Sequence, residues 1–233
     1  MNWTSLVDGL LPAHCQFCGA AGVGPVCAAC QADLPWNQPA CPGCALPAPL
    51  PDLLCPACQR KPRAFDAAFA AFRYAAPGSQ ALLGLKYGAR FHEARWLAAS
   101  LATALRLRED ALPQRLIPVP LHRGRLWRRG YNQAQELARH LGKTLDIPVA
   151  PKLARRLRAT PDQIGLSAPQ RRLNLRGAFA VGKEVAGLHV ALLDDVMTTG
   201  ATLEELARTC KAAGAIRVEA WALARQPLGK VTT

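Results

Sequence analysis

The first 59 residues of the sequence contain no lysine and no arginine, although the whole chain of 233 residues carries a formal net charge of +13. The acidic residues of this segment are Asp8, Asp33 and Asp52, so the positive excess lies between residues 60 and 233. The N-terminal segment is therefore not the basic surface of the protein. The basic remainder predicts a polyanionic partner such as phosphate, pyrophosphate or nucleic acid.

The sequence also contains no long apolar run, and we expect no secretory leader. No uninterrupted apolar stretch approaches the roughly 18 residues of a membrane-spanning helix, and the alanine-rich stretch 67–85 is broken by Arg73, Pro77 and Gly78. The first eight residues carry no positive charge, and Asp8 interrupts their apolar patch. We therefore expect a cytoplasmic protein without membrane insertion.

Composition divides the chain into two parts. Residues 1–62 hold eight of the nine cysteines and show little periodic hydrophobicity, whereas the rest alternates between strand-like and helix-like apolar segments. This pattern predicts a small N-terminal module at 1–62 and an α/β domain at 63–233. We expect the domain to contain a mostly parallel sheet flanked by helices.

The individual elements follow from the same alternation. Strands are expected at residues 64–74, 116–120, 188–193 and 216–223, and helices at 79–86, 91–107, 131–141 and 199–213. Gly142 and Gly214 are interpreted as the stops of the last two helices. Residues 150–177, rich in Arg, Pro and Gln, are expected to form a long mobile surface loop with one short helix, and residues 226–233 a frayed tail.

Eight cysteines form four Cys-x-x-Cys pairs, which are Cys15/Cys18, Cys27/Cys30, Cys41/Cys44 and Cys55/Cys58. Each pair presents two thiolates on one tight turn, and two pairs complete a tetrahedral all-thiolate site, so these eight ligands predict two structural zinc ions. Disulfides are disfavoured under reducing conditions, and redox or iron–sulfur use is the alternative. We expect sequential pairing, 15/18/27/30 and 41/44/55/58, while interleaved pairing stays open.

The charge of this module bears on its role. Four thiolates around one zinc ion leave a negative site, and a surface without Lys or Arg should repel nucleic-acid phosphates. We therefore expect a structural role or the docking of a partner. The ninth cysteine, Cys210, falls on an expected helix and is interpreted as a small core residue.

The most informative segment runs from Val190 to Thr202. A buried strand ends in two adjacent acids, and a turn rich in Thr and Gly then opens a helix. The amides of a helix N-terminus suit a 5′-phosphate, while carboxylates suit ribose hydroxyls and the waters around Mg²⁺. The candidate ligand-binding residues of this loop are Asp194, Asp195, Val196, Met197, Thr198, Thr199, Gly200, Ala201 and Thr202.

Two other interpretations compete for this segment. A Walker pair with Gly142-Lys143-Thr144 would need glycine at position 137, which is a leucine. An acidic helix cap followed by threonines would need no ligand. The order of strand, Asp-Asp and Thr-Thr-Gly-x-Thr resembles the 5-phosphoribosyl-1-pyrophosphate loop of type I phosphoribosyltransferases. This resemblance implies that Asp194 and Asp195 contact the ribose and that Thr198 to Thr202 hold the 5′-phosphate.

A strongly basic loop follows the expected strand 116–120. It places Arg128 and Arg129 at the carboxyl edge of a sheet, where α/β proteins bind ligands, and guanidinium groups there suit a pyrophosphate. Lys86 is either a surface charge or a phosphate contact. Trp127 and Tyr131 either stack on a base or pack against the neighbouring helix.

Several segments together resemble the ComF (ComFC) competence family. They are Leu116 to His122, Arg129-Gly130-Tyr131-Asn132-Gln133, Leu85-Lys86-Tyr87, Thr160 to Gln163 and Arg171 to Asn174, behind the four cysteine pairs. The resemblance covers nearly the whole chain. It implies a type I phosphoribosyltransferase-like fold with a double zinc ribbon, a ligand contacted by Lys86, Arg129, Gln163 and Arg171, and a role in DNA uptake.

The expected chemistry is displacement of Mg-bound pyrophosphate from ribose C1, which needs positioning and neutralisation of the leaving group more than a protein nucleophile. The candidate catalytic residues are Asp194, Asp195, Arg128 and Arg129, and residues 155–176 are expected to close over the site. The acceptor cannot be read from the sequence. Binding of single-stranded DNA without catalysis, and sensing of phosphoribosyl pyrophosphate without turnover, are the alternatives. A protein of the DNA-uptake machinery is a further possible partner.

Overall fold

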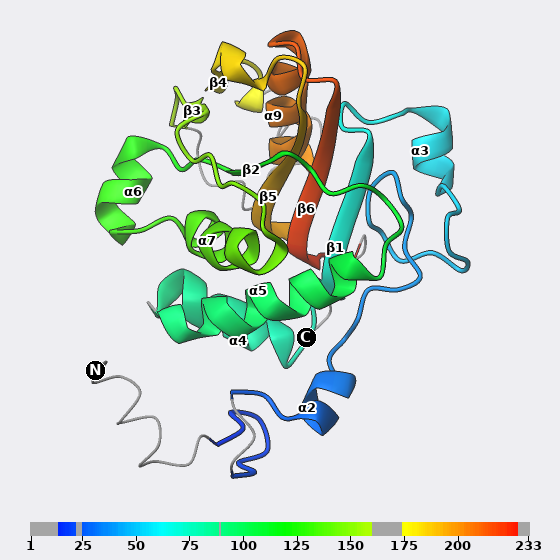
Figure 1. The fold of residues 1–233 in the computed structure, drawn as a ribbon, viewed down its shortest axis with the longest axis vertical. Coiled ribbons are helices and arrows are strands. Elements are labelled where there is room, and N and C mark those ends of the chain that lie inside the picture. Colours follow the sequence, from blue (N-terminus) through cyan, green and yellow to red (C-terminus); the bar gives the residue numbers. More distant parts are fainter. Residues whose placement is uncertain (1–13, 22–24, 89, 160–173, 228–233) are drawn as a thin grey trace.

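The computed structural model describes residues 14–21, 25–88, 90–159 and 174–227. Its main sheet has four parallel strands in the spatial order β1-β6-β5-β2 (Figure 1). The strands are β1 (Ala67–Arg73), β2 (Arg115–Pro118), β5 (His189–Met197) and β6 (Arg217–Arg225). The helices are α2 (Ala28–Ala32), α3 (Pro56–Arg60), α4 (Gly78–Tyr87), α5 (Phe91–Arg106), α6 (Arg123–Arg129), α7 (Gln133–Leu145) and α9 (Ala201–Ala212), with a 3-10 turn at η1 (Lys183–Val185).

Helices cover both faces of this sheet, which confirms the expected α/β arrangement. One core lies between the sheet and α4, α5 and α7, where Leu101 and Leu141 are buried. The other core lies between the sheet and α9, where Leu206 is buried. Leu193 of β5 belongs to the first core and Leu192 to the second, because successive strand residues point to opposite faces. Burial on both faces is the reason that the central strands are almost continuously apolar.

A smaller antiparallel sheet pairs β3 (Ala154–Arg156) with β4 (Phe179–Val181) and packs into the core on the α9 side. The expectation of an irregular loop over 150–177 is therefore wrong at 154–156, because three residues are too few to show a strand period. Residues 160–173 of that stretch lie outside the described residues. In the part of the chain that is described, no helix has the length and apolar character needed to cross a membrane.

The expectation that a helix stops at Gly142 is also wrong. Helix α7 continues to Leu145, and Asp146 ends it with a φ of 56°. A Cβ at Gly142 would lie only 2.4 Å from Cγ2 of Val149 and 2.7 Å from the carbonyl oxygen of Ile147. The glycine is therefore required by the close approach of the returning chain and not by the end of the helix.

The segment expected to be a basic loop contains helix α6. The ring of His122 accepts a hydrogen bond from the Gly124 N–H at 3.3 Å, which caps the first turn. Gly130, with a φ of 83°, ends the helix in the left-handed conformation. The arginines of this segment therefore lie on a helix whose two ends are fixed by local backbone chemistry.

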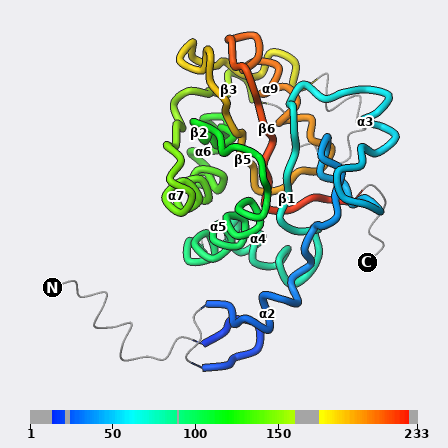
Figure 2. Tube along the Cα trace, turned by 45° about the vertical axis from the view of Figure 1, so that its right-hand side comes forward, coloured from blue at the N-terminus to red at the C-terminus, as the bar shows by residue number. Residues whose placement is uncertain are grey.

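The second half of the cysteine-rich segment runs along the edge of the main sheet beside β1 (Figure 2). The Asn37 N–H donates to the Ala71 carbonyl at 2.9 Å, and the Ala68 N–H donates to the Pro42 carbonyl at 2.7 Å. Ala45 is fully buried in the core on the α9 side. Backbone bonds and core contacts thus join this half to the α/β domain.

The first half of the cysteine-rich segment contacts helix α5. The side chain of Gln16 donates to the Glu93 carboxylate at 3.1 Å, and the Phe17 ring meets the Trp96 ring edge-on at 5.8 Å between centroids. Figure 2 shows this half on the side of the molecule where α4 and α5 lie. The two halves therefore rest on different parts of the α/β domain.

Candidate functional site

The acid pair lies on β5, which runs between β2 and β6 and continues past both acids to Met197. Oδ1 of Asp194 accepts the Asp195 N–H at 2.9 Å, and Oδ1 of Asp195 accepts the Val196 N–H at 2.8 Å. Asp195 is only 4% exposed, and its Oδ2 accepts no hydrogen bond from the described residues but faces Nζ of Lys86 at 3.6 Å. The backbone thus holds one oxygen of Asp195 and leaves the other for a cation.

The electrostatics of the pair favour a bound cation. Burial and the neighbouring Asp195 carboxylate raise the pKa of Asp194 to about 8, although Lys86 opposes the shift. Burial disfavours the charge of Lys86, but attraction to Asp195 and Asp194 outweighs it and raises the pKa of the amine. Mg²⁺ prefers carboxylate and water oxygens, so the orphaned Oδ2 and the crowded charge of the pair fit this ion.

The turn after β5 has the geometry of an anion site. Gly200 has a φ of 77°, a left-handed conformation that favours glycine, and helix α9 begins at Ala201. Oγ1 of Thr199 accepts the Ala201 N–H at 3.3 Å, and the Glu204 N–H closes the first helical turn onto the Gly200 carbonyl. Thr198 is exposed. The free amides of a helix N-terminus and nearby threonine hydroxyls together suit a phosphate.

Basic residues from two other elements reach the same region. Lys86 lies in the last turn of α4, and the guanidinium of Arg129, at the end of α6, lies 5.5 Å from the centroid of the Tyr87 ring. Nη1 of Arg129 donates to the Gln133 side chain at 2.6 Å, and the Tyr131 hydroxyl donates to a backbone carbonyl of α4 at 2.5 Å. These contacts fasten the end of α4 to the turn between α6 and α7, so both cations are held in place.

The structure thus brings together Asp194, Asp195 and Lys86, and Arg129 lies close enough to Lys86 to oppose its charge. Arg128 is exposed on α6. Gln163 and Arg171, which the sequence also suggested as ligand contacts, lie outside the described residues. The site as described therefore combines β5, α9 and the ends of α4 and α6.

Arg156 belongs to the site but carries no motif in the sequence. It ends β3, with its guanidinium 5.5 Å from the centroid of the Phe179 ring. Burial and repulsion from Arg125 lower the pKa of Arg156, and attraction to Asp194 partly offsets them. The side chain therefore adds positive charge on the β3 side of the acid pair. Arg225 likewise carries no motif in the sequence. It ends β6, and its guanidinium donates to the Met197 carbonyl at the end of β5.

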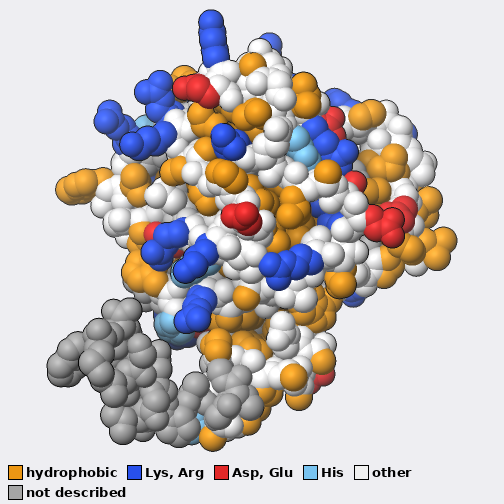
Figure 3. All heavy atoms as spheres, in the orientation of Figure 1, with side chains coloured by type: hydrophobic (Ala, Val, Ile, Leu, Met, Phe, Trp, Pro, Cys, Tyr) orange, Lys and Arg blue, Asp and Glu red, His pale blue; other side chains and the backbone are white. Residues whose placement is uncertain are grey.

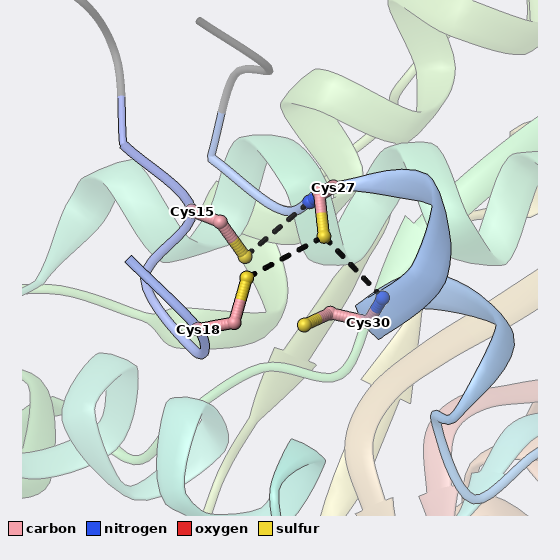
Figure 4. A group of neighbouring side chains, drawn as sticks. All are labelled: Cys15, Cys18, Cys27 and Cys30. Carbon is pink, nitrogen blue, oxygen red and sulfur yellow. Dashed lines mark hydrogen bonds between the residues drawn. The ribbon is translucent and has the colours of Figure 1, made fainter. Parts of the chain in front are cut away.

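The first cysteine cluster joins Cys15, Cys18, Cys27 and Cys30, whose side chains converge in Figure 4. All four sulfurs lie within 4.8 Å of one another, and those of Cys18 and Cys27 are 3.7 Å apart. Sulfur ligands about 2.3 Å from a tetrahedral zinc ion would be about 3.8 Å apart. Backbone N–H groups of Cys18 and Cys27 lower the pKa of Cys15 to about 6, which favours its thiolate.

The second cluster joins Cys41, Cys44, Cys55 and Cys58 within the same 4.8 Å limit. The Cys55 N–H donates to the sulfur of Cys41 at 3.2 Å, and the sulfurs of Cys44 and Cys55 are 3.7 Å apart. All eight cysteines are free of disulfides. The grouping is sequential along the chain, and both four-cysteine sites are compatible with structural zinc.

Two known domain families match the chain. The double zinc ribbon domain matches residues 6–62, and the phosphoribosyl transferase domain matches residues 126–232. Together with the parallel sheet and the two four-cysteine sites, they define an α/β protein of the phosphoribosyltransferase-like class with an N-terminal double zinc ribbon.

Two relatives identify the family within this class. The chain is 45% identical over 135 residues to competence protein F of Haemophilus influenzae, a match that spans 57% of this chain and 59% of that protein. It is 37% identical over 170 residues to DNA utilization protein YhgH of Escherichia coli O157:H7, spanning 71% of this chain and 75% of that protein. The chain belongs to the ComF family, that of competence protein F and its YhgH homologues.

Among solved structures, the purine phosphoribosyltransferase of Pyrococcus horikoshii is 23% identical, with a TM-score of 0.37 over 60% of this chain and 78% of that chain. A likeness of this strength supports no functional conclusion.

Proposed function

We propose that the chain binds 5-phosphoribosyl-1-pyrophosphate with Mg²⁺ at the carboxyl end of β5. The observation that supports this most directly is the succession of an acid pair, a left-handed glycine and the start of α9. The orphaned Oδ2 of Asp195 suits the sugar end of a sugar phosphate with its cation, and the amides at the start of α9 suit the phosphate end. A competence role similar to that named for the relatives is part of the proposal, as are a cytoplasmic location and a module boundary between residues 62 and 63.

Each part of the site has a role in this proposal. Asp194 and Asp195 accept hydrogen bonds from the ribose hydroxyls, and residues 196–202 hold the 5′-phosphate. Lys86 and Arg129 face the pyrophosphate, because they are held beside the acid pair by α4 and α6. Asp195 would hold Mg²⁺ through its second carboxylate oxygen, and the ion would supply positive charge to neutralise the leaving pyrophosphate. Arg128, Gln163 and Arg171 complete the proposed contacts.

Binding is tested by the change in melting temperature on adding phosphoribosyl pyrophosphate and Mg²⁺. The wild-type protein should be stabilised by about 2 to 3 kcal/mol at a ligand concentration of about 100 times the dissociation constant. The double variant Asp194→Asn/Asp195→Asn should lose this stabilisation. Glu109→Gln, which changes an exposed acid in the connection after α5, should keep it. Equal stabilisation of all three proteins contradicts the proposal.

Turnover is a separate question from binding. Release of pyrophosphate from the Mg-bound ligand separates a transferase, or a slow hydrolase, from a sensor that binds without reaction. If the transferase proposal holds, Lys86→Met and Arg129→Met should slow the release by more than they weaken binding, because both charges act on the leaving group. Tight binding with no release under any acceptor would favour the sensor.

A second candidate function, binding of single-stranded DNA, is favoured by the exposed surface of α6. Trp127 is 90% exposed, and Arg123 and Arg128 flank it on the same helix. Aromatic rings among arginines bind single strands by stacking and by contacts with phosphates. Figure 3 shows Lys and Arg side chains gathered on the face where α5, α6 and α7 lie.

The basic surface continues from α6 across α7 and α5. Burial and repulsion from nearby Arg139, Arg95 and Lys143 lower the pKa of His140. Glu136 is the acid that opposes them there. Such a strip of positive charge from two adjacent helices fits a phosphate backbone.

Oligonucleotide binding at several salt concentrations tests this candidate. A steep fall of affinity with salt is expected, because each phosphate contact contributes a log–log slope of about −0.7 for single strands. Trp127→Ala should weaken binding by about 1 to 3 kcal/mol. The control Leu107→Ala removes another exposed apolar side chain, 76% exposed at the end of α5, and should leave affinity unchanged. Salt-independent binding would exclude this function.

A further inference from the structure

Arg225 connects the second cysteine cluster to the phosphate-binding loop. Its side chain is 1% exposed at the end of β6. Nε donates to the backbone carbonyl of Cys44 at 2.9 Å, and Nη1 donates to the carbonyls of Met197, at 2.8 Å, and Thr198. One guanidinium therefore bonds both a residue of the cluster and the two residues at which strand β5 ends and the turn before α9 begins.

The charge of Arg225 needs a counter-charge, because a buried guanidinium is costly without one. Among the described residues, no carboxylate oxygen lies within 4.0 Å of its nitrogens, and its hydrogen-bond partners are carbonyls. Four thiolates with one zinc ion carry a formal charge of about −2. The second cluster, whose Cys44 carbonyl Arg225 already contacts, therefore supplies negative charge on the side away from the loop.

The connection is short and is built from rigid parts. Met197 and Arg225 are paired in the ladder between β5 and β6, and the Gln226 N–H donates to the Met197 carbonyl at 3.0 Å. On the other side, the cluster is fixed to β1 through the bond between the Ala68 N–H and the Pro42 carbonyl. A change in the position of the turn around Cys44 therefore reaches the carbonyls of the loop through one side chain.

We propose that Arg225 is a positioning residue through which the second cysteine cluster, with its metal, holds the phosphate-binding loop in the shape that binds a phosphorylated ligand. The inference rests on the proposed function of that loop. It also assigns different roles to the two clusters. The second cluster controls affinity at the loop, whereas the first, which contacts α5 through Gln16 and Phe17, does not.

Two cysteine variants separate the clusters. Cys55→Ser disables the second and Cys18→Ser the first, and zinc content confirms which site each variant has lost. Hydrogen exchange over residues 196–203 reports the loop directly, and titration with Mg²⁺ and phosphoribosyl pyrophosphate reports its affinity. Cys55→Ser should exchange faster in the loop and bind about tenfold more weakly or worse, the effect of losing one hydrogen bond to a charged group. Cys18→Ser should change neither quantity by more than about twofold.

Variants of Arg225 test the side chain itself. Arg225→Met keeps much of the apolar stem but removes every donor, and Arg225→Lys keeps the charge but cannot bond the cluster and the loop at once. Both should loosen the loop in exchange, with the larger loss of affinity in Arg225→Met. Arg115→Met, at the start of β2 and the opposite end of the sheet, is the matched control and should leave loop exchange and affinity unaltered.

The outcomes distinguish the inference from the function on which it rests. If the wild-type protein fails to bind the ligand, the proposed function is wrong, while the exchange measurements still decide the role of Arg225. If the wild type binds and Arg225→Met matches it in both measurements, the inference is overturned. Equal loosening by both cysteine variants also overturns it, because the metal would then act through overall stability. Should Cys55→Ser or Arg225→Met unfold, the test is repeated with Cys18→Ser, in which the second cluster is the remaining four-cysteine zinc site. Loop exchange and affinity are then compared in the same protein before zinc is removed, after it is removed and after it is restored.

Discussion

Replacing Asp194 with asparagine is expected to change how stability depends on pH. Burial and the charge of Asp195 raise the pKa of Asp194 to about 8, although Lys86 opposes the shift. An unfolded chain releases this proton near pH 4, so the folded state holds one proton more than the unfolded state between about pH 4 and about pH 8. The free energy of unfolding therefore falls as the pH rises through that interval. Asparagine has a similar shape and still accepts the Asp195 N–H, but it does not ionise.

The size of the effect follows from the single proton. One extra bound proton changes the free energy of unfolding by about 1.4 kcal/mol per pH unit. Between about pH 5.5 and about pH 7.5, the wild-type protein should therefore lose about 2 to 3 kcal/mol relative to Asp194→Asn. The variant gains stability at the expense of the group that we propose binds the ribose.

Urea unfolding followed by tryptophan fluorescence, in buffer containing zinc, measures this difference at the two pH values. The cysteines and histidines titrate alike in the wild type and the variant, so their contributions cancel in the comparison. Glu109→Gln, which changes an exposed acid, should show a difference that does not depend on pH. A constant difference between Asp194→Asn and the wild type would refute the reasoning, because Asp194 would then ionise as an ordinary aspartate does.

Three further predictions concern stability and metal content. Gly142→Ala should destabilise the protein by about 1 to 3 kcal/mol in urea unfolding, because the new methyl group would overlap Val149; an unchanged midpoint would contradict the packing described for α7. Tyr131→Phe removes the bond to α4 and should lower stability by about 1 kcal/mol by the same assay, with no loss expected if that bond is absent in solution. Metal analysis should find two zinc ions per chain, and one in either Cys18→Ser or Cys55→Ser; two ions retained in either variant would speak against the four-cysteine sites.

The local geometry of the loop that we propose binds phosphate could be predicted from the sequence, because its parts are adjacent in the chain. Strand, acid pair, glycine and helix start follow one another, so a local pattern contains the whole arrangement. Lys86 and Arg129 stayed ambiguous, because only the packing of α4 against the turn after α6 brings them to the acid pair. Arg156 and Arg225 gave no signal, since each ends a strand far away in the sequence.

Boundaries and irregular regions were predicted less well. Strand β5 runs to Met197 and not to residue 193, because its pairing with β6 continues past the acid pair. The hydrophobic pattern of the sequence could not predict this extension, because backbone pairing does not require apolar side chains. The placement of residues 35–45 along β1 was likewise invisible, because the backbone hydrogen bonds that align the two segments carry no side-chain pattern. Composition alone therefore suggested a more separate N-terminal module than the structure contains.

The position of β6 has a consequence for synthesis of the chain. Strand β6 comes late in the sequence, yet it fills the place between β1 and β5. A nascent polypeptide can pair β2 with β5 before it, but β1 must wait for residues 217–225 to leave the ribosome. Its unpaired edge is open to wrong partners during that wait. Translation that stops before residue 217 would yield a product in which β1 and the ribbon beside it have no sheet to join.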